Sequence, residues 1–156
     1  MTFSMTNTIG FMGCGNMAQA IIKGLIDTKV IPPQKIYISN RTPGKPIKLR
    51  DQYSVNIASS NEELVEKSQV VVLAMKPQDL LAAIDPLGGI FMEKQIVISL
   101  AAGIRMGTLK KHLPLCRWIR LMPNTPTLIG KGQVGYFTDS DQEDSYLDTL
   151  VEDLFK

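Results

Sequence analysis

A doubly wound, mostly parallel α/β sheet is the fold class that this sequence predicts, and three observations predict it. Short apolar runs of strand length alternate with segments of helical periodicity along the chain. The first of these runs leads into a glycine-rich turn and then into an amphipathic helix. The length of 156 residues suffices for one domain with its own core. Alternating strands and helices place helices on both faces of a parallel sheet.

The unit from residue 8 to residue 25, TIGFMGCGNMAQAIIKGL, predicts a dinucleotide-binding turn of the G-x-G-x-x-A type. Its apolar start, Ile9–Met12, has the length of a strand, and the residues after the turn repeat at helical spacing. Gly13 allows a tight turn, Gly15 lets a pyrophosphate approach the backbone, and Ala18 permits close packing of helix on strand. Free N–H groups at the helix start would face the phosphates. An ordinary glycine turn is the alternative.

The second predicted strand, residues 35–39, ends at Asn40-Arg41-Thr42 and predicts the type of dinucleotide. An acidic residue near this point binds the ribose 2′-hydroxyl of NAD, whereas an arginine accommodates the 2′-phosphate of NADP. No acidic residue occurs between Lys35 and Arg50, so NADP is favoured over NAD. The alternative is that Arg41 is only a solvated loop cation. Two further cations of this segment could assist, Lys45 and Lys48.

The remaining chain continues the alternation of strands and helices. Further strands are predicted at residues 55–57, 70–74, 95–99, 118–121 and 134–138, the last at an edge of the sheet. Helices are predicted at residues 43–52, from residue 60 or 61, at 78–87, at 106–112 and in the C-terminal tail after the capping box at 140–143. The continuous apolar run at 70–74 is typical of a central parallel strand.

Polar and small residues that follow the later strands predict where a ligand would lie, because ligands bind at the carboxyl ends of parallel strands. Met75-Lys76-Pro77-Gln78 follows one strand and should lie along the cofactor. Ala101-Ala102-Gly103 follows the next and would let a flat ring come close. After the strand at 118–121, the side chains of Asn124 and Thr125 could bind a ligand or cap the turn, and the residues alone leave both readings open.

Composition excludes several classes of protein. The chain is 44% apolar and 21% charged, with a net charge of +2 and no dense block of Lys or Arg. These values are those of an ordinary globular protein and indicate neither a nucleic-acid nor an anionic-membrane partner. No run reaches the length of a membrane span, and the first eight residues lack the features of a signal peptide, so a cytoplasmic protein is expected.

The cysteines and the single histidine are expected to have structural roles. Cys14 and Cys116 are too few and too far apart for a disulfide framework or a metal site, so both thiols are expected to be free and no metal is expected. Cys14 is interpreted as filling a small-residue position in the turn and not as a nucleophile. His112 lies near a predicted helix C-terminus, so a favourable interaction with the helix dipole is expected and not a catalytic role.

Five segments together resemble the pyrroline-5-carboxylate reductases, in that family's order and over nearly the whole chain. They are residues 9–18, 40–42, 75–78, 99–103 and 122–126. The resemblance implies a Rossmann-like NADP-binding domain at residues 1–139. It also implies an NAD(P)H-dependent imine reductase. This activity passes a hydride to the C=N carbon of 1-pyrroline-5-carboxylate, a small imino acid, and gives L-proline in the last step of proline biosynthesis.

The resemblance also implies roles for individual residues, with NADP(H) as the preferred cofactor and NAD(H) as the alternative. The pyrophosphate would be held by Met12, Gly13, Cys14, Gly15, Asn16 and Met17. Asn40 and Arg41 would hold the 2′-phosphate, and Asn61 the adenosine side. The ribose and nicotinamide would be flanked by Ala74, Met75, Lys76, Pro77, Ala101, Ala102 and Gly103. Asn124 would lie near the site of hydride transfer, and no catalytic residue is otherwise implied.

The resemblance also implies that the family's second, helical domain, which supplies dimerisation and much of the imino-acid pocket, is not included in this sequence. Residues 140–156 are expected to form a terminal helix leading toward it, because an apolar stripe continues to the end without a stop signal. The helix is expected to be exposed and able to pair artificially. We expect a homo-oligomer at full length, and an isolated fragment that is inactive. Alternatives are another two-domain NADP-dependent dehydrogenase of β-hydroxyacid type, or a non-catalytic nucleotide-binding module.

Overall fold

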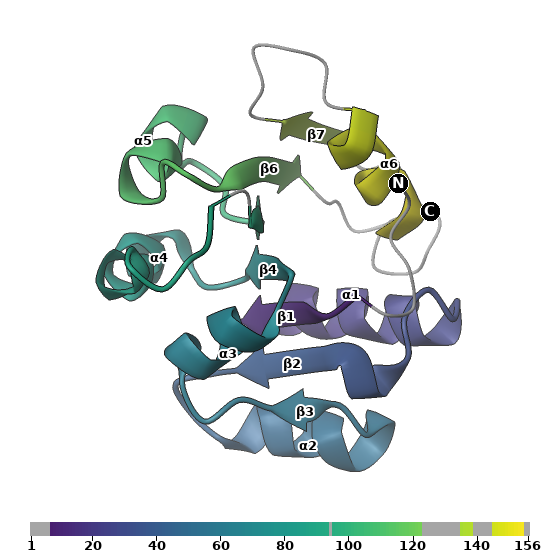
Figure 1. Cartoon of the computed structure of the whole chain (residues 1–156). Helices are drawn as coiled ribbons and strands as arrows, with labels where there is room; N and C mark the ends of the chain where they lie inside the picture. The colour runs from purple at the N-terminus through teal and green to yellow at the C-terminus, as the bar shows by residue number, and fades with distance from the viewer. Residues whose placement is uncertain (1–6, 94, 123–134, 139–144, 155–156) are drawn as a thin grey trace.

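The computed structural model describes residues 7–93, 95–122, 135–138 and 145–154, and a seven-stranded sheet runs through them (Figure 1). The strands are β1 (Ile9–Met12), β2 (Ile36–Ser39), β3 (Asn56–Ile57), β4 (Val70–Leu73), β5 (Ile96–Ser99), β6 (Arg117–Met122) and β7 (Gly135–Thr138). Their order is β3-β2-β1-β4-β5-β6-β7, and only the β6–β7 pair is antiparallel. The predicted mostly parallel sheet is confirmed, with β7 as an edge strand.

Helices cover both faces of the sheet, as the predicted double winding requires. They are α1 (Asn16–Asp27), α2 (Gly44–Tyr53), α3 (Asn61–Lys67), α4 (Pro77–Ile84), α5 (Met106–His112) and α6 (Ser145–Leu154), with 3₁₀ turns at Pro33–Lys35 and Asp85–Leu87. One apolar core contains buried residues of α1, α2 and α6, and the other contains those of α3, α4 and α5. The central strands β1, β4 and β5 are buried along their whole length between the two cores, which accounts for their mainly apolar sequences.

The helix predicted at residues 78–87 is shorter in the structure. The α-helix ends at Ile84 and a 3₁₀ turn takes over at Asp85–Leu87. Pro86 has no backbone N–H to donate to the carbonyl one turn earlier, so the α-helical pattern stops there.

The apolar face of the terminal helix α6 is buried, so the expectation that this helix is exposed and free to pair is wrong. Leu147, Leu150, Val151 and Leu154 have exposed fractions between 0% and 4% and belong to the same core as the inner face of α1. The apolar stripe was correctly predicted, but its partner is the sheet and not another molecule. The predicted capping box at 140–143 lies outside the described residues.

Gly10, in the middle of β1, allows α3 to lie close against the sheet. A Cβ atom at this position would stand 2.8 Å from Leu64 Cδ2 of α3 and would overlap Ser68 Oγ. The third position of the sequence motif had been assigned to helix packing at Ala18, which is indeed fully buried. Gly10 is a second close approach, on the opposite face of the sheet, which the sequence reasoning missed.

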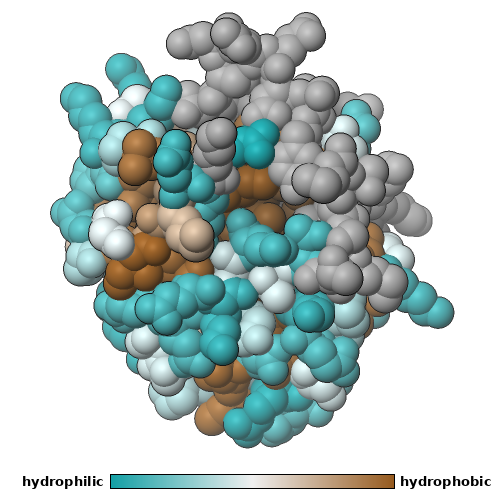
Figure 2. Space-filling model, viewed as in Figure 1, coloured by the Kyte–Doolittle hydropathy of each residue, from teal (hydrophilic) through white to brown (hydrophobic). Residues whose placement is uncertain are grey.

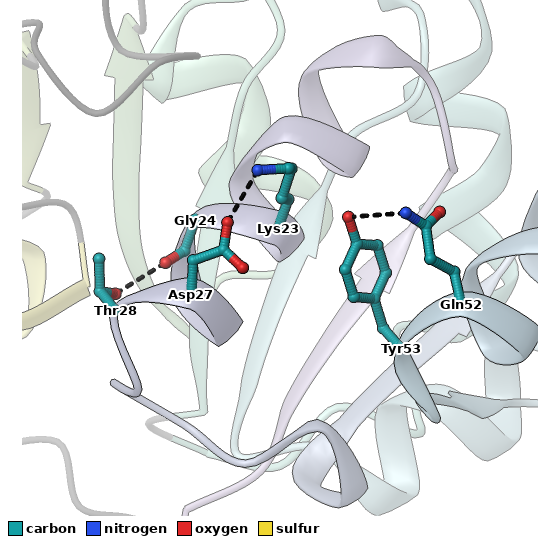
Figure 3. A network of polar contacts seen from close by, with 6 residues as sticks. All are labelled: Lys23, Gly24, Asp27, Thr28, Gln52 and Tyr53. Carbon is teal, nitrogen blue, oxygen red and sulfur yellow. Dashed lines mark hydrogen bonds and ion pairs between the residues drawn. The ribbon is translucent and has the colours of Figure 1, made fainter.

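The C-terminal end of α1 is held by local polar contacts (Figure 3). Thr28 Oγ1 donates to the Gly24 carbonyl at 2.7 Å, and Lys23 Nζ donates to Asp27 Oδ2 at 2.8 Å. On the neighbouring helix α2, Gln52 Nε2 donates to the Tyr53 hydroxyl at 3.2 Å. The contacts of Thr28 and Lys23 lie at the opposite end of α1 from the glycine turn.

The surface seen in Figure 2 is mainly hydrophilic over β2, β3 and α2, whereas hydrophobic side chains gather over α4 and α5. Separately, no helix among the described residues combines the length and apolar character needed to cross a membrane.

Candidate dinucleotide-binding site

A cavity of about 510 Å³ opens at the carboxyl ends of β1, β2 and β4. These strands end in register, since Met12 pairs with both Ser39 and Leu73. The chain segments that leave the three strands therefore meet at one edge of the sheet. The cavity is lined by Met12, Gly13, Cys14, Gly15, Ser39, Asn40, Arg41, Thr42, Lys45, Asn61, Ala74, Met75, Lys76, Asp79 and Ala83.

The turn at Gly13 holds β1 and β4 close together. Gly13 has φ +103°, and a Cβ atom there would lie 2.9 Å from the Ala74 carbonyl carbon and 3.0 Å from Met75 N. Its own N–H donates to the Ser39 carbonyl at 2.8 Å, so the turn is also tied to β2. A residue with a side chain would be strained here both by its backbone angle and by contact with backbone atoms. This is the tight turn that the motif predicts.

Gly15 and the start of α1 form an open cradle. Gly15 is the N-cap of α1 with an ordinary φ of −78°, and a Cβ atom there would have no neighbour within 4 Å. No side chain caps this helix end, and its first turn carries no acidic residue. The N-terminus of α1 thus meets the cavity at Gly15 without a side-chain cap, and the positive end of an uncapped helix is suited to bind phosphate groups.

Asn40 orients the glycine turn. Its Oδ1 accepts a hydrogen bond from Cys14 N at 3.2 Å, and its Nδ2 donates to the Thr42 carbonyl at 3.0 Å. Gln19 Nε2 fixes the other side of the turn by donating to the Cys14 carbonyl at 2.9 Å. The amide of Asn40 therefore already has partners within the protein, and its position shapes the cradle. Sequence reasoning had given it only a direct role at the 2′-phosphate.

Cations gather where the cavity meets the end of β2. Arg41 and Lys45 both line it there, beside the hydroxyl-bearing Thr42. The Arg41 side chain is 83% exposed, and its Nη2 lies 3.6 Å from Asp79 Oδ1 of α4. Asn61, at the start of α3, completes this end, and its Oδ1 accepts a hydrogen bond from Ser39 Oγ at 2.7 Å. The pocket can hold a second anionic group at this end.

The β4–α4 connection forms the opposite wall. Ala74, Met75 and Lys76 line the cavity, and Lys76 is the N-cap of α4 with Pro77 as its first helical residue. Pro77 itself does not line the cavity. Asp79 and Ala83 do, although the sequence reasoning did not name them. They lie four residues apart on one face of a helix that begins at the site, and that spacing is the signal that could have found them.

Some predicted residues are absent from the wall of the cavity. Asn16 and Met17 form the first turn of α1, and Met17 packs against the core. Residues 101–103 follow β5, the neighbour of β4 in the sheet, where Ala101 is 4% exposed and Gly103 has φ +82°. Asn124 lies outside the described residues.

The two cysteines are free and buried. Burial raises the pKa of Cys14 although the nearby Lys45 opposes this, and burial raises the pKa of Cys116 to about 11. A protonated thiol is a poor nucleophile, so the structural interpretation of Cys14 is supported.

His112 also lies away from the cavity wall. Its Nε2 is 3.1 Å from Asp85 Oδ1, and its Nδ1 is 3.0 Å from the Thr108 carbonyl, so it joins α5 to the end of α4. Over the described ranges, no cluster of three or more His, Cys, Asp or Glu side chains could hold a metal ion.

Comparison with known proteins adds to this geometry. The sequence model of a family described as NADP oxidoreductase coenzyme F420-dependent matches residues 8–103. Pyrroline-5-carboxylate reductase of Escherichia coli (strain K12) is 35% identical over 129 residues, 82% of this chain and 48% of the relative. The Arabidopsis thaliana enzyme of the same name is 34% identical over 123 residues, 79% of this chain and 45% of the relative. The chain thus spans about half the length of the curated relatives it matches.

Solved structures agree with this comparison. A pyrroline-5-carboxylate reductase from Coxiella burnetii superposes with a TM-score of 0.87 at 32% identity, covering 96% of this chain and 56% of that one. Pyrroline carboxylate reductase of Plasmodium falciparum with NADP bound gives a TM-score of 0.82, covering 97% of this chain and 55% of that one. At 24% identity the second likeness concerns the fold alone.

Proposed function

This chain belongs to the family described as NADP oxidoreductase coenzyme F420-dependent, and because it is also similar to pyrroline-5-carboxylate reductases, we propose that it is the NADP-binding portion of such an enzyme. The whole enzyme would reduce the C=N bond of 1-pyrroline-5-carboxylate to give L-proline, the last step of proline biosynthesis, with NADPH preferred over NADH. The relatives' printed names support the activity, and one solved relative has NADP bound.

One observation carries the proposal: a single cavity contains both an open helix N-terminus and a cationic end. The amides at the start of α1 are suited to a diphosphate, because Gly15 leaves the space beside them empty. Arg41 and Lys45, across the same cavity, are suited to the extra phosphate that distinguishes NADP from NAD. The residues present therefore fit the cofactor.

The described residues contribute binding and orientation. The bound nicotinamide would supply the hydride that reaches the C=N carbon. The glycine turn and Arg41 would fix the two ends of the adenosine diphosphate moiety, while Ala74–Lys76 would direct the remainder of the cofactor toward β5. Residues 101–103 would then lie beside the ring, and Asn124 near the reacting carbon. A protonated imine is already electrophilic, so no general base is required. Lys76 would therefore not act as a base, and its role would be to position the backbone beside Pro77.

A titration of the chain with NADPH and NADH tests this proposal through nicotinamide fluorescence. NADPH should bind more tightly, and Arg41→Gln should weaken NADPH about tenfold while leaving NADH nearly unchanged. Arg50→Gln is a matched control, because Arg50 is an exposed cation on α2 paired with Asp51 at 3.4 Å and absent from the cavity wall. Tighter binding of NADH than of NADPH by the unmodified chain would contradict the proposal.

The reaction itself needs a separate test, since the chain covers only about half of its relatives. We propose that these 156 residues alone bind the dinucleotide but have negligible reductase activity, because they span only about half the length of the curated relatives. Turnover of 1-pyrroline-5-carboxylate by a protein that includes the remaining half, compared with a panel of hydroxyacids, separates the imine reductase from a β-hydroxyacid dehydrogenase. Rapid turnover by the 156-residue chain would contradict the proposed lack of activity.

We further propose a cytoplasmic location and a homo-oligomeric whole enzyme. Two buried cysteines that form no disulfide are typical of a reducing compartment, which supports the location. Size-exclusion chromatography with light scattering of the whole enzyme would test the assembly.

A further inference from the structure

An ion pair bridges the cavity at its cationic end. Arg41 follows β2, and Asp79 lies in the first turn of α4, which follows β4. These two strands flank β1, so the two side chains approach from opposite walls, and Arg41 Nη2 stands 3.6 Å from Asp79 Oδ1. Both residues line the cavity. The cation proposed for the 2′-phosphate therefore already has an anionic partner in the free protein.

Asp79 differs in the sign of its charge from the other charged residues of the cavity wall. Within the described part of the chain, the wall also contains Arg41, Lys45 and Lys76, and Asp79 is its one carboxylate. Its side chain is 38% exposed, so the charge is close to solvent but still within the pocket. A carboxylate beside a phosphate-binding cation both occupies the cation and repels the phosphate.

A purely structural role for Asp79 is the competing explanation. Acidic residues in the first turn of a helix are favourable because they interact with the helix dipole, and Asp79 is the acidic residue in the first turn of α4. That role would affect the stability of α4. It would not change how the protein distinguishes two dinucleotides that differ only by a phosphate on the ribose.

We propose that Asp79 is a specificity-determining residue that weakens the preference for the 2′-phosphorylated dinucleotide by holding Arg41 across the cavity. This inference rests on the proposed binding of NADP. A 2′-phosphate must displace the carboxylate from Arg41 and then remain near it, whereas the 2′-hydroxyl of NADH needs no such exchange. Because the Arg41–Asp79 ion pair is exposed, its free energy is small, so the aspartate lowers the affinity for NADPH without abolishing binding.

The test is isothermal titration calorimetry of the chain with NADPH and, separately, with NADH. Asp79→Asn should lower the dissociation constant of NADPH about fivefold and change that of NADH by less than about twofold. Asp27→Asn is the matched control, because it removes a carboxylate from another exposed ion pair, the one with Lys23 on α1, and should leave both dissociation constants within about twofold. In an Arg41→Gln background, Asp79→Asn should lower the dissociation constant of NADPH by a smaller factor than in the unmodified chain, because only the direct repulsion of the phosphate remains to be relieved.

Several outcomes overturn the inference. One is weaker binding of NADPH by Asp79→Asn, since the aspartate would then position Arg41 productively. Another is an equal change for both dinucleotides, or a lower melting temperature with no change in their ratio, since either would leave only a structural role. Asp79→Ser serves as a second variant if Asp79→Asn folds poorly. Failure of the unmodified chain to bind either dinucleotide would instead refute the proposed function, and the inference with it.

Discussion

Gly13 and Gly15 stand two residues apart in one turn, yet their constraints differ. Gly13→Ala should lower the free energy of unfolding by about 1–3 kcal/mol, because φ is +103° and the new Cβ would meet the backbone of Ala74. Gly15→Ala should change stability by less than about 1 kcal/mol, because nothing lies within 4 Å of the new Cβ in the free protein. It should nevertheless reduce NADPH affinity strongly, since the methyl group occupies the phosphate space. Urea unfolding and NADPH titration measure the two effects, and normal NADPH binding by Gly15→Ala would contradict the assignment.

Cys116 should make the stability of the protein sensitive to alkaline pH. Burial raises its pKa from 9.0 to about 11 in the folded state, so the protonated thiol favours folding below about pH 9. Above that value the unfolded chain ionises first, and this contribution is lost as the pH rises through about 11. Urea unfolding should therefore show that the difference in free energy of unfolding between the wild type and Cys116→Ala becomes smaller over this pH range. A gap that stays constant from pH 8 upward would contradict the prediction.

At the residue scale, sequence reasoning named the glycines and several of the side chains that line the cavity, and it missed the partners of those side chains. Gly13, Gly15 and Arg41 were predictable because the motif prescribes their backbone or charge. Asn40 accepts a hydrogen bond from Cys14 N, and Arg41 forms an ion pair with Asp79. Both contacts depend on which loops the folded sheet brings together. Those partners are 26 and 38 residues apart, so no local pattern encodes them.

At the scale of elements, the contact between β1 and α3 should not tolerate a side chain at Gly10. Gly10→Ala would place a methyl group 2.8 Å from Leu64 Cδ2, and we expect a loss of about 1–3 kcal/mol in the free energy of unfolding. Gly24→Ala is the matched control, because Gly24 lies within α1 with nothing within 4 Å of a Cβ, and alanine should stabilise that helix by about 0.5–1 kcal/mol. Thermal unfolding of both variants measures the difference, and equal melting temperatures would show that the β1–α3 contact can relax.

The packing of α6 on the sheet can be tested at its centre. Leu150 is 0% exposed, so Leu150→Ala should cost about 2–5 kcal/mol in the free energy of unfolding. Glu152→Ala on the exposed side of the same helix should cost less than about 0.5 kcal/mol. If both variants unfold at the urea concentration of the wild type, α6 does not contribute to the core.

The central strands were predictable because β1, β4 and β5 are buried along their whole length, and enclosure on both faces leaves a strong sequence signal. The run at β4 is the clearest case, since all four of its residues are buried. The partner of α6 was not predictable, because an apolar stripe fits a sheet, another domain or a second molecule equally well. Similarly, periodicity could not show that Pro86 would convert the end of the α4 segment to a 3₁₀ turn.

For the whole molecule, binding of NADPH should raise the melting temperature, because the cavity joins β1, β2, β4, α1 and α4 in the folded state only. At a concentration of one hundred times Kd the stabilisation would be about 2.7 kcal/mol. Trp118 is the single tryptophan and is fully buried in the core under α3, α4 and α5, so its fluorescence reports on that core. Unfolding followed by tryptophan fluorescence and by circular dichroism should shift together. A shift seen by only one method would mean that the two faces of the sheet unfold separately.

The missing side-chain cap at the start of α1 means that a bound diphosphate would finish the helix as well as occupy a site. The phosphate oxygens of the nucleotide would then act as the helix cap, because they would accept hydrogen bonds that no side chain at residue 15 accepts. A serine or aspartate at this position could satisfy the amides from within, at the expense of the space the ligand needs. A capping side chain at residue 15 would thus stabilise the helix but fill the space for the ligand, and glycine at this position keeps that space open.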